Sequence, residues 1–321
     1  MFRNIITIGS THFDEDLNTQ GATVSHVHWE PPAFGNEKAI TALEKLRPHK
    51  ELIDKANQVA MENLFQAEAN WVGMGLASEV IPGMTDTTIL HAGPPLTWDR
   101  MSGPLQGAIL GALVFEKLAP DLGTAKQLVF DGKITFSPCH EHQAVGPMAG
   151  VISPSMPVFC IHNPIHGNNS YTTMNEGLGK VLRYGANGSE VIERLHWMKK
   201  TLYPVLKKAI EKSAGIDLKN CIAQALHMGD EGHNRNKAAS ALLLKEILPF
   251  ILETCRSQEL IKECTQFISG NDHFFLNLSM ATAKVCLDAS SGIENSSLVT
   301  VMARNGTEFG IQISSLPGEW F

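Results

Sequence analysis

The 321-residue sequence lacks the excess of basic residues that proteins binding nucleic acid or anionic membranes show. It has 26 Lys and Arg residues against 33 Asp and Glu residues, and a formal net charge of −7. Binding to nucleic acid or to an anionic membrane needs a basic patch that displaces counterions, so we expect neither as a partner. A small anionic ligand remains compatible, because it needs only a local cluster of donors.

Cysteine is scarce and shows no C-x-x-C pair, which disfavours a secreted disulfide scaffold and predicts reduced thiols. No apolar run approaches the length of a membrane span. The opening residues, Met-Phe-Arg-Asn-Ile-Ile-Thr-Ile-Gly, hold too short an apolar run for a signal peptide. We therefore expect a cytoplasmic protein without a membrane partner.

Common cofactor and catalytic motifs are also missing. The turn after the first predicted strand, Gly9-Ser-Thr-His, is not the G-x-G-x-x-G phosphate loop, and no H-E-x-x-H, G-x-S-x-G, kinase or EF-hand pattern occurs. The sequence thus predicts no cofactor. Its 43% hydrophobic and 18% charged content is typical of a folded protein, and its length predicts two or three domains.

Periodicity predicts helices and strands along most of the chain. Residues 5–9 and 22–29 read as strands on either side of a helix, the start of a parallel α/β unit. From Ser189, apolar residues recur at steps of four and three, which predicts a helix bent at Pro204. Asp217 and Asn236 are predicted to cap later helices, and residues 297–314 to form a β-hairpin.

The stretch from Phe136 to Phe159 carries Cys139-His140-Glu141-His142 ahead of two Gly/Pro turns. Each buried polar group without a partner costs roughly 1–3 kcal/mol, so we predict that these side chains line a cleft. A metal site, a Cys/His nucleophile pair and a set of donors for an anionic substrate all remain open. On an extended strand both histidines would share one face, whereas Cys139 and His140 would point to opposite sides. The structural alternative is a hydrogen-bonded turn.

A second polar run lies between two predicted helices. His227-Met-Gly-Asp-Glu-Gly-His-Asn-Arg-Asn-Lys contains Asp230, Glu231, His233 and Arg235. Such a density of titratable groups at a helix junction predicts a site. The alternative is a capping network, in which Asp230 and Asn236 accept hydrogen bonds from free N–H groups.

A third candidate is the loop Asn175-Glu-Gly-Leu-Gly-Lys180 with the nearby Arg183. Backbone N–H groups at Gly177 and Gly179, together with the two cations, suit a phosphate or a carboxylate. A plain turn is the alternative.

Two further segments hold candidate residues. His91 and Arg100 flank a Pro-rich loop in which the arginine would bind a carboxylate, or would instead pair with a surface carboxylate. In Asn271-Asp272-His273 the histidine is a candidate general base, and Asp272 is the alternative helix cap.

Six sequence blocks, taken in order, make the chain resemble the YlbE/YahG-like bacterial family over nearly its whole length. The blocks are His91-Ala-Gly-Pro-Pro, Gly146-Pro-Met-Ala-Gly, Ser153-Pro-Ser-Met-Pro, Asn175-Glu-Gly-Leu-Gly-Lys-Val-Leu-Arg, His227-Met-Gly-Asp-Glu-Gly-His-Asn-Arg-Asn-Lys and Met302-Ala-Arg-Asn-Gly. That family is similar to the large subunit of oxamate carbamoyltransferase.

The resemblance implies a subunit that works with an FdrA-type protein in anaerobic allantoin breakdown. The implied reaction converts oxalurate and phosphate into oxamate and carbamoyl phosphate. We expect a homo-oligomer with these small anions as substrates and with neither metal nor cofactor.

The implied fold is multi-domain, with α/β and α+β parts. We expect a Rossmann-like α/β unit with linking helices at 1–85 and a central α+β domain with the site loops at 86–185. A helical subdomain would follow at 186–290, and a hairpin returning to the α+β core at 291–321.

The chain departs from the family pattern at two places. His140-Glu141-His142 stands where we expect three consecutive histidines, and relatives run on past Trp320-Phe321. A C-terminal segment is therefore expected to be absent, and the role of Glu141 is open.

For this reaction, Lys180, Arg183 and the N–H groups of residues 177–179 are predicted to bind phosphate. Arg100 or Arg235 would bind the oxalyl carboxylate, with His91 and Asn175 also near the substrate. His140 or His233 would stabilise the developing oxyanion and the other would protonate the departing nitrogen, with Asp230 and Glu231 as candidate catalytic carboxylates.

These residues would form a composite cleft, in which residues 136–159 face the Lys180 loop and the junction at 230–235. Two other functions remain open. One is a non-catalytic binding or scaffold subunit, and the other is a metal-dependent amide hydrolase whose ligands would be Cys139, His140, His142, Asp230 and His233.

Overall fold

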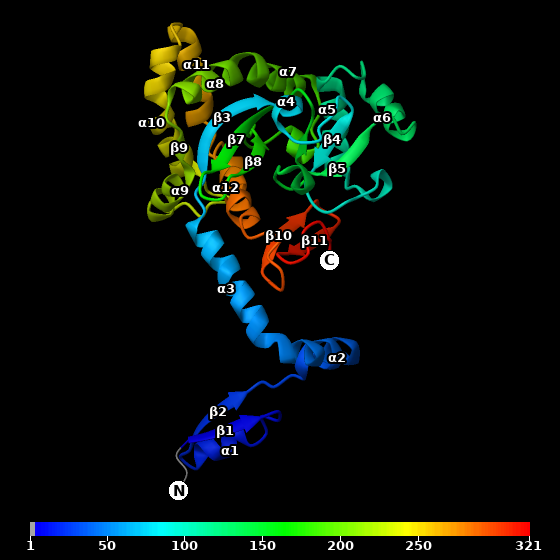
Figure 1. Cartoon of the computed structure of the whole chain (residues 1–321), viewed down its shortest axis with the longest axis vertical. Helices are drawn as coiled ribbons and strands as arrows, with labels where there is room; N and C mark the ends of the chain where they lie inside the picture. Colours follow the sequence, from blue (N-terminus) through cyan, green and yellow to red (C-terminus); the bar gives the residue numbers. More distant parts are fainter. Residues whose placement is uncertain (1–3) are drawn as a thin grey trace. The chain divides into compact units, whose positions relative to one another are not determined.

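The computed structural model describes residues 4–321. The chain divides into two compact units, Met1–Asp54 and Lys55–Phe321, and each is described here by itself (Figure 1). The predicted domain boundaries at residues 85, 185 and 290 remain predictions.

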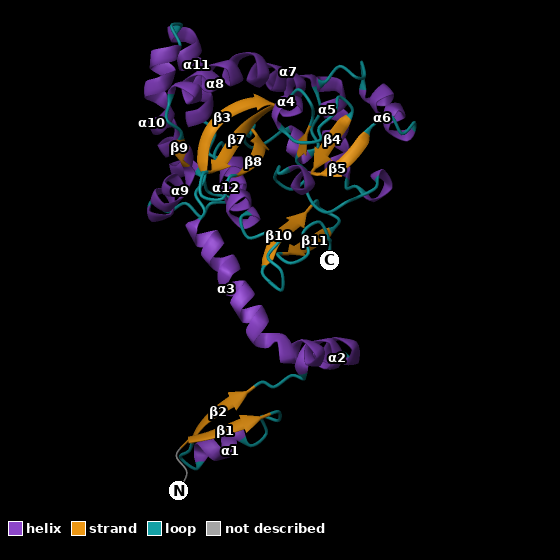
Figure 2. Cartoon of the chain, in the orientation of Figure 1, coloured by secondary structure: helices purple, strands orange, loops and turns teal. Residues whose placement is uncertain are grey.

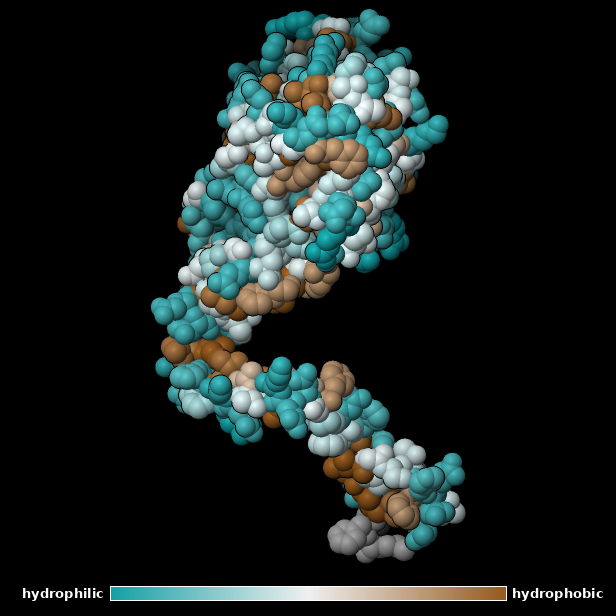
Figure 3. Space-filling model, turned by 90° about the vertical axis from the view of Figure 1, so that its right-hand side faces the viewer, coloured by the Kyte–Doolittle hydropathy of each residue, from teal (hydrophilic) through white to brown (hydrophobic). Residues whose placement is uncertain are grey.

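The first unit begins with the predicted strand-helix-strand motif. Strands β1 (Asn4–Ile8) and β2 (Thr23–Val27) pair in parallel, with α1 (Asp14–Thr19) between them in sequence. The 3₁₀ turn Pro32–Gly35, helix α2 (Glu37–Leu46) and the 3₁₀ turn Arg47–His49 follow. None of residues 4–54 is buried, and hydrophobic side chains are visible on the surface of this unit in Figure 3. The chain passes into the second unit within α3 (Lys50–Gln66).

The second unit contains a four-stranded antiparallel sheet with the order β8-β7-β3-β9. Its strands are β3 (Asn70–Leu76), β7 (Pro157–Asn163), β8 (Asn168–Thr173) and β9 (Ile216–Asp217). Trp71 and Phe159 are fully buried on this sheet and meet edge to face, with ring centroids 5.1 Å apart. This aromatic contact lies in the main hydrophobic core.

A smaller three-stranded sheet has the order β5-β4-β6. Its strands are β4 (Thr88–His91), β5 (Thr135–Pro138) and β6 (Val151–Ile152). β4 pairs in parallel with β5 and antiparallel with β6. The mixed α/β class predicted from the sequence is confirmed, whereas the Rossmann-like layout of the N-terminal part remains a prediction.

Helices surround these sheets (Figure 2). They are α4 (Ala77–Val80), α5 (Gly103–Phe115), α6 (Leu122–Phe130), α7 (Ser189–Trp197), α8 (Tyr203–Lys212), α9 (Leu218–His227), α10 (Lys237–Thr254), α11 (Gln258–Ser269) and α12 (Leu276–Asp288). Helix α12 contacts β7 and β8 (Figure 1), so it brings a long helical face against the main sheet. No helix among residues 4–321 is long and apolar enough to cross a membrane.

Two local predictions concern the helices: the cap at Asp217 is confirmed, and the bend at Pro204 remains a prediction. A five-residue π-helical segment, Met198–Leu202, joins α7 to α8 just before Pro204, because proline cannot supply the N–H that a regular helix needs. The Asp217 carboxylate caps α9 by accepting from the N–H of Asn220 at 3.0 Å.

Helix α5 packs closely on the loop after residue 181. A Cβ atom on Gly107 would clash with the backbone carbonyl of Gly185, and one on Gly111 would lie 2.6 Å from the Leu182 side chain. The glycines thus let α5 approach this loop and fix its position.

The C-terminal residues form the predicted hairpin of β10 (Val299–Arg304) and β11 (Phe309–Ile313). Beyond it, the Trp320 ring packs edge to face on His140, with centroids 5.8 Å apart. The terminal tryptophan therefore has its packing partner within this unit.

Candidate functional site

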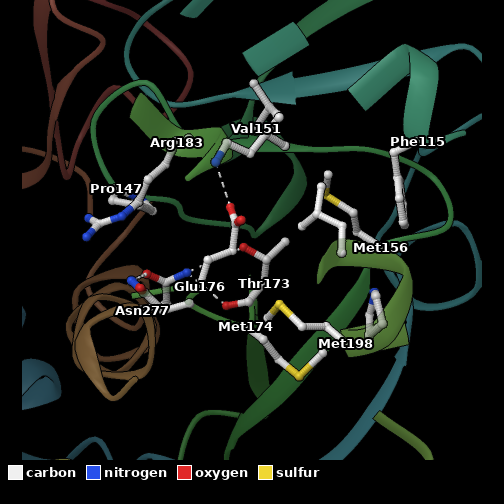
Figure 4. Close-up of a pocket in the computed structure, with 15 residues that line it drawn as sticks. Phe115, Pro147, Val151, Met156, Thr173, Met174, Glu176, Arg183, Met198 and Asn277 are labelled. Atoms are coloured by element: carbon white, nitrogen blue, oxygen red, sulfur yellow. Dashed lines mark hydrogen bonds between the residues drawn. The ribbon is translucent and has the colours of Figure 1, made fainter. Parts of the chain in front are cut away.

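A pocket lies between the end of β8, the loop that follows it and the start of α12. It encloses about 540 Å³ of empty space, including the part open to solvent. Figure 4 shows Arg183, Glu176 and Asn277 on one side and Phe115, Met156 and Met198 on the other. A mostly apolar wall with a few converging polar groups is the usual composition of a small-molecule site.

A chain of amides fixes the polar side of this pocket. The Asn277 side chain donates to the backbone carbonyl of Thr173 at 2.8 Å, and the Asn175 side chain donates to Asn277 Oδ1 at 2.9 Å. Asn175 Oδ1 in turn accepts from the N–H of Gly177 at 2.8 Å. The N–H of Gly177, predicted to bind phosphate, is therefore already used within the protein.

Gly177 occupies a position that needs glycine. Its φ is +100°, and a Cβ atom there would lie 3.2 Å from Asn271 Oδ1. The Asn271 side chain also donates to the backbone carbonyl of Asn175 at 2.8 Å. These contacts hold the loop from residue 175 to residue 183 in one conformation.

The Glu176 side chain links the two ends of this loop and the following helix by hydrogen bonds. One carboxylate oxygen accepts from the N–H of Leu182 at 2.8 Å, and the other accepts from Arg194 Nε at 3.2 Å. Burial raises the pKa of Glu176, partly offset by these donors. Sequence reasoning missed this residue, although it lies inside the predicted loop motif.

Arg183 is the cation of the pocket. It donates to the backbone carbonyl of Gly177 at 3.2 Å and stacks on the Tyr184 ring at 4.5 Å. Its Nε atom is buried without a hydrogen-bond partner, and no carboxylate among residues 4–321 forms an ion pair with it. Because a half-buried guanidinium stays charged, this arginine is available to an anion.

His273 lies within electrostatic range of Arg183 and His233. Its side chain is buried, its Nδ1 atom has no partner, and its N–H donates to Asn271 Oδ1 at 3.0 Å. Burial lowers the pKa of His273, and the positive charge of Arg183 lowers it further.

His140 lies elsewhere, in a closed polar cluster. Its Nδ1 atom accepts from Lys284 Nζ at 2.8 Å, and its Nε2 atom donates to Gln312 Oε1 at 3.1 Å. Lys284 also pairs with Asp288 at 2.8 Å. Burial, followed by the charge of Lys284, lowers the pKa of His140 to about 4. Both ring nitrogens are used, and the residue does not line the pocket.

Residues Cys139–His142 form a 3₁₀ turn rather than an extended strand. The alternation of faces considered from the sequence is therefore wrong for this segment. His142 bonds to the carbonyl of Pro82 at 2.6 Å and to Ser137 Oγ at 2.8 Å, and burial raises the pKa of Cys139 to about 12. The hydrogen-bonded turn describes this segment, and no group of three or more His, Cys, Asp or Glu among residues 4–321 is placed to hold a metal.

The junction at residues 230–235 is largely a capping network. Asp230 accepts from the N–H of Ala239 at 2.8 Å, and Glu231 accepts from the N–H of Arg235 at 2.8 Å. The backbone N–H of Arg235 is the main cause that lowers the pKa of Glu231. The prediction that the Asn236 side chain caps α10 is wrong, because that side chain donates to the carbonyl of His233 instead. His233 and Arg235 are exposed.

The remaining predicted residues do not line the pocket. Lys180 is exposed and lies 3.5 Å from a carboxylate oxygen of Glu190. Arg100 pairs with Glu308 on the hairpin, as the structural alternative for this residue predicts. His91 is buried, its Nδ1 atom bonds to the carbonyl of Ala92 at 2.9 Å, and its Nε2 atom has no partner. Burial is the main cause that lowers the pKa of His91.

The composite cleft predicted from the sequence is present in part. Residues 147–157 supply five of the lining residues, among them Pro147, Gly150 and Met156, and they face the loop with Asn175 and Arg183. Helix α12 takes the place predicted for the junction at 230–235. The catalytic and binding roles of individual residues remain predictions.

Comparison with known proteins places this chain among longer relatives. The family model described as oxamate carbamoyltransferase subunit AllG matches residues 134–321. The chain is 47% identical over 320 residues to a protein of Escherichia coli (strain K12) with the name uncharacterized protein YahG. That match covers 99% of this chain and 68% of the relative.

It is also 43% identical over 271 residues to oxamate carbamoyltransferase subunit AllG of the same strain, a match that covers 84% of this chain and 65% of AllG. Among solved structures, a conserved protein of unknown function from Enterococcus faecalis V583 superposes with a TM-score of 0.83 at 49% identity. The superposition covers 85% of this chain and 65% of that chain.

The chain thus spans about two thirds of the length of these relatives. The resemblance seen in the sequence blocks is confirmed. Because the family model matches more than half of the chain, and because the identities exceed 40%, the chain belongs to the family of the oxamate carbamoyltransferase subunit AllG.

Proposed function

We propose that the chain is a subunit of a carbamoyltransferase that converts oxalurate and phosphate into oxamate and carbamoyl phosphate, and that the oxalyl group binds in the pocket at Arg183. The observation that carries this proposal is the half-buried Arg183 at the polar end of a mostly apolar pocket. The nearby carboxylate of Glu176 acts on its charge but forms its ion pair with Arg194 instead. The printed name of the relative AllG supports the type of reaction.

The pocket suits a small planar anion. The guanidinium of Arg183 offers a fork of N–H donors that matches a carboxylate. Phe115, Met156 and Met198 give the pocket an apolar wall, and electrostatic interactions next to apolar surfaces are stronger than in bulk water. The amide chain through Asn175 and Asn277 keeps the loop that carries Arg183 in place.

The reaction sets clear demands on the site. A phosphate oxygen attacks the carbamoyl carbon of oxalurate, the bond from that carbon to the oxamate nitrogen breaks, and the proton of hydrogen phosphate ends on that nitrogen. The site must therefore hold two anions next to each other and support one proton transfer.

The experiment that tests this proposal compares Arg183→Gln with Arg256→Gln, a control at an exposed arginine distant in sequence from the pocket motifs. Carbamoyl phosphate formation from oxalurate and phosphate is measured with the purified chain and with an FdrA-type partner added. We expect Arg183→Gln to raise the KM for oxalurate about tenfold or more, because a hydrogen bond to a charged group contributes roughly 1.5–3 kcal/mol. Equal KM values in both variants would show that the oxalyl group binds elsewhere, for example at Arg100 or Arg235.

A second candidate function is a binding subunit whose partner carries the chemistry. One observation favours it: the pocket lining within residues 4–321 includes no histidine, and the predicted proton-transfer residues His140 and His233 lie outside it. In that case the chain alone binds oxamate in calorimetry but forms no carbamoyl phosphate, and mixing with the partner restores the reaction. A homo-oligomeric state, an FdrA-type partner and a cytoplasmic location are part of the same proposal.

A further inference from the structure

We propose that Arg183, His273 and His233 form a subsite for inorganic phosphate next to the pocket. The identity of the anion rests on the proposed function, because phosphate is the second substrate of that reaction. The existence of an oxyanion subsite at these three residues rests on the structure alone.

Hydrogen bonds tie the three segments together at the start of α12. Arg183 donates a hydrogen bond to the carbonyl of Gly177. In the turn at residues 271–275, the Asn271 side chain donates to the carbonyl of Asn175 in the same loop. The hydroxyl of Ser279 donates to the carbonyl of Gly232 at 2.9 Å, which places His233 against the same helix. Segments that lie 40 to 90 positions apart in the sequence thus approach one another.

Two buried nitrogen atoms of this cluster have no partner. They are Nδ1 of His273 and Nε of Arg183, and His273 as a whole residue is only 9% exposed. A buried polar group without a partner costs roughly 1–3 kcal/mol, so such groups call for an explanation such as an absent ligand. A phosphate oxygen can accept hydrogen bonds from both groups once His273 carries a proton on Nδ1.

The charges of the cluster also fit an anion. Arg183 and His233 both oppose the protonation of His273, while Asp272 favours it. Glu231 lies near His233 but already accepts hydrogen bonds from the N–H groups of Asn234 and Arg235. Glu176 also acts on the charge of Arg183, but its carboxylate already accepts hydrogen bonds from the N–H of Leu182 and from Arg194. The free donors of the cluster therefore face an anion rather than a carboxylate of the protein.

This arrangement places the two substrates as the reaction needs them. An arginine has five N–H donors, so Arg183 can face the oxalyl carboxylate in the pocket with one edge and phosphate with the edge that carries Nε. Phosphate held there lies beside the pocket, from which a phosphate oxygen can reach the carbamoyl carbon. His273 binds phosphate directly in this scheme and is a substrate-binding residue.

The test is a titration of the full chain with inorganic phosphate, followed by NMR of the histidine ring protons and by calorimetry. In the wild-type protein we expect phosphate to raise the pKa of His273 by about one unit, because an adjacent anion favours the charged imidazole. The affinity for phosphate should fall about tenfold in His273→Gln and in His233→Gln. It should stay unchanged in the matched control His227→Gln, at an exposed histidine of the same junction.

The proposal is overturned if phosphate leaves the titration of His273 unchanged, or if His233→Gln binds phosphate as tightly as the control. The exposed His233 and the wild-type NMR measurement decide the question even if His273→Gln does not fold. Carbamoyl phosphate formation with an unchanged KM for phosphate in His233→Gln would refute the subsite and leave the proposed function standing. If phosphate binding depends on His273 but no carbamoyl phosphate forms, the subsite stands and the proposed function is refuted.

Discussion

Helix α12 carries two polar clusters that differ in how fully their hydrogen bonds are satisfied. Two turns after Asn277, Lys284 joins His140 and Asp288 in a cluster where both imidazole nitrogens and the ammonium group have partners. Near the start of the helix, Arg183 and His273 keep buried nitrogens without partners. In the first cluster only the Nε2 atom of Gln312 lacks a partner, whereas in the second the atoms without partners belong to an arginine and a histidine, which can bind an anion.

The difference shows that residue type alone does not identify a site. His140 belongs to the most versatile run of side chains in the sequence, yet its bonds to Lys284 and Gln312 make it a structural link between α12 and the C-terminal hairpin. Arg183 lies in a common Gly-rich loop, yet it is the cation that a ligand can reach. Four predictions test this contrast between the two clusters.

Loss of the lysine should break the closed cluster. Lys284→Ala leaves the half-buried Asp288 and His140 without the ammonium group of the buried Lys284. Breaking a buried ion pair costs about 3–5 kcal/mol, with the lower value for a half-buried carboxylate. We expect a decrease of this size in the free energy of unfolding measured in urea, and less than about 0.5 kcal/mol for the exposed control Lys262→Ala. A loss below about 1 kcal/mol in Lys284→Ala would mean that the cluster is not structural.

Loss of the arginine should affect binding and leave folding intact. Arg183→Gln keeps a donor for the carbonyl of Gly177 but removes the charge, so oxamate affinity in calorimetry should fall about tenfold to a hundredfold. The free energy of unfolding should change by less than about 1 kcal/mol, because the wild-type arginine has no carboxylate partner. A stability loss as large as that of Lys284→Ala, with unchanged oxamate affinity, would show that Arg183 is a structural residue and not a ligand-binding one.

The closed cluster should also respond to pH. The pKa of His140 is lowered to about 4 in the folded protein, so protonation favours the unfolded chain. The stabilisation that depends on neutral His140 is fully present above the unfolded pKa near 6.5. It is lost as the pH falls toward the folded pKa of about 4. The free energy of unfolding should therefore decrease by about 2 kcal/mol between pH 7 and pH 5. Urea unfolding at both values should show this decrease, and His140→Gln should remove about that part of it. An equal pH dependence of the free energy of unfolding in the wild type and in His140→Gln would show that His140 does not contribute to it.

The smallest expected effect is a difference in stability between alanine substitutions at two glycines of the loop that carries Arg183. Gly177 has φ of +100° and a close neighbour in Asn271, whereas Gly179 has φ of +90° with nothing near its missing Cβ atom. Alanine at Gly179 should cost about 1 kcal/mol from backbone strain alone, and alanine at Gly177 about 1 kcal/mol more. Thermal unfolding of the two variants measures this difference, and equal losses would show that the contact with Asn271 carries no cost.

Local features of the fold could be predicted from the sequence. The βαβ start, the helix from Ser189, the cap at Asp217 and the C-terminal hairpin all follow from patterns within about 30 residues. Turn chemistry, proline geometry and apolar spacing determine these elements, and each can be read without knowledge of the tertiary structure.

The candidate site could be predicted only in part. The loop with Asn175 and Arg183 was identified because its glycines and cations lie together in the sequence. The hydrogen bonds of His140 could not be predicted, since its partners Lys284 and Gln312 lie more than 140 residues away in the sequence. The structural role of Glu176 likewise depends on Arg194 on the next helix. A hydrogen-bond partner distant in sequence decides in each case whether a polar residue is free to bind a ligand.

A crystal structure of the full chain soaked with oxamate shows directly whether the ligand binds at Arg183. We expect the oxamate carboxylate within about 3 Å of the Arg183 guanidinium, at hydrogen-bond distance and inside the pocket bordered by Glu176 and Met198. The His140 cluster should be unchanged by the ligand. Oxamate bound at His140 and Lys284 with the pocket at Arg183 empty would contradict the account.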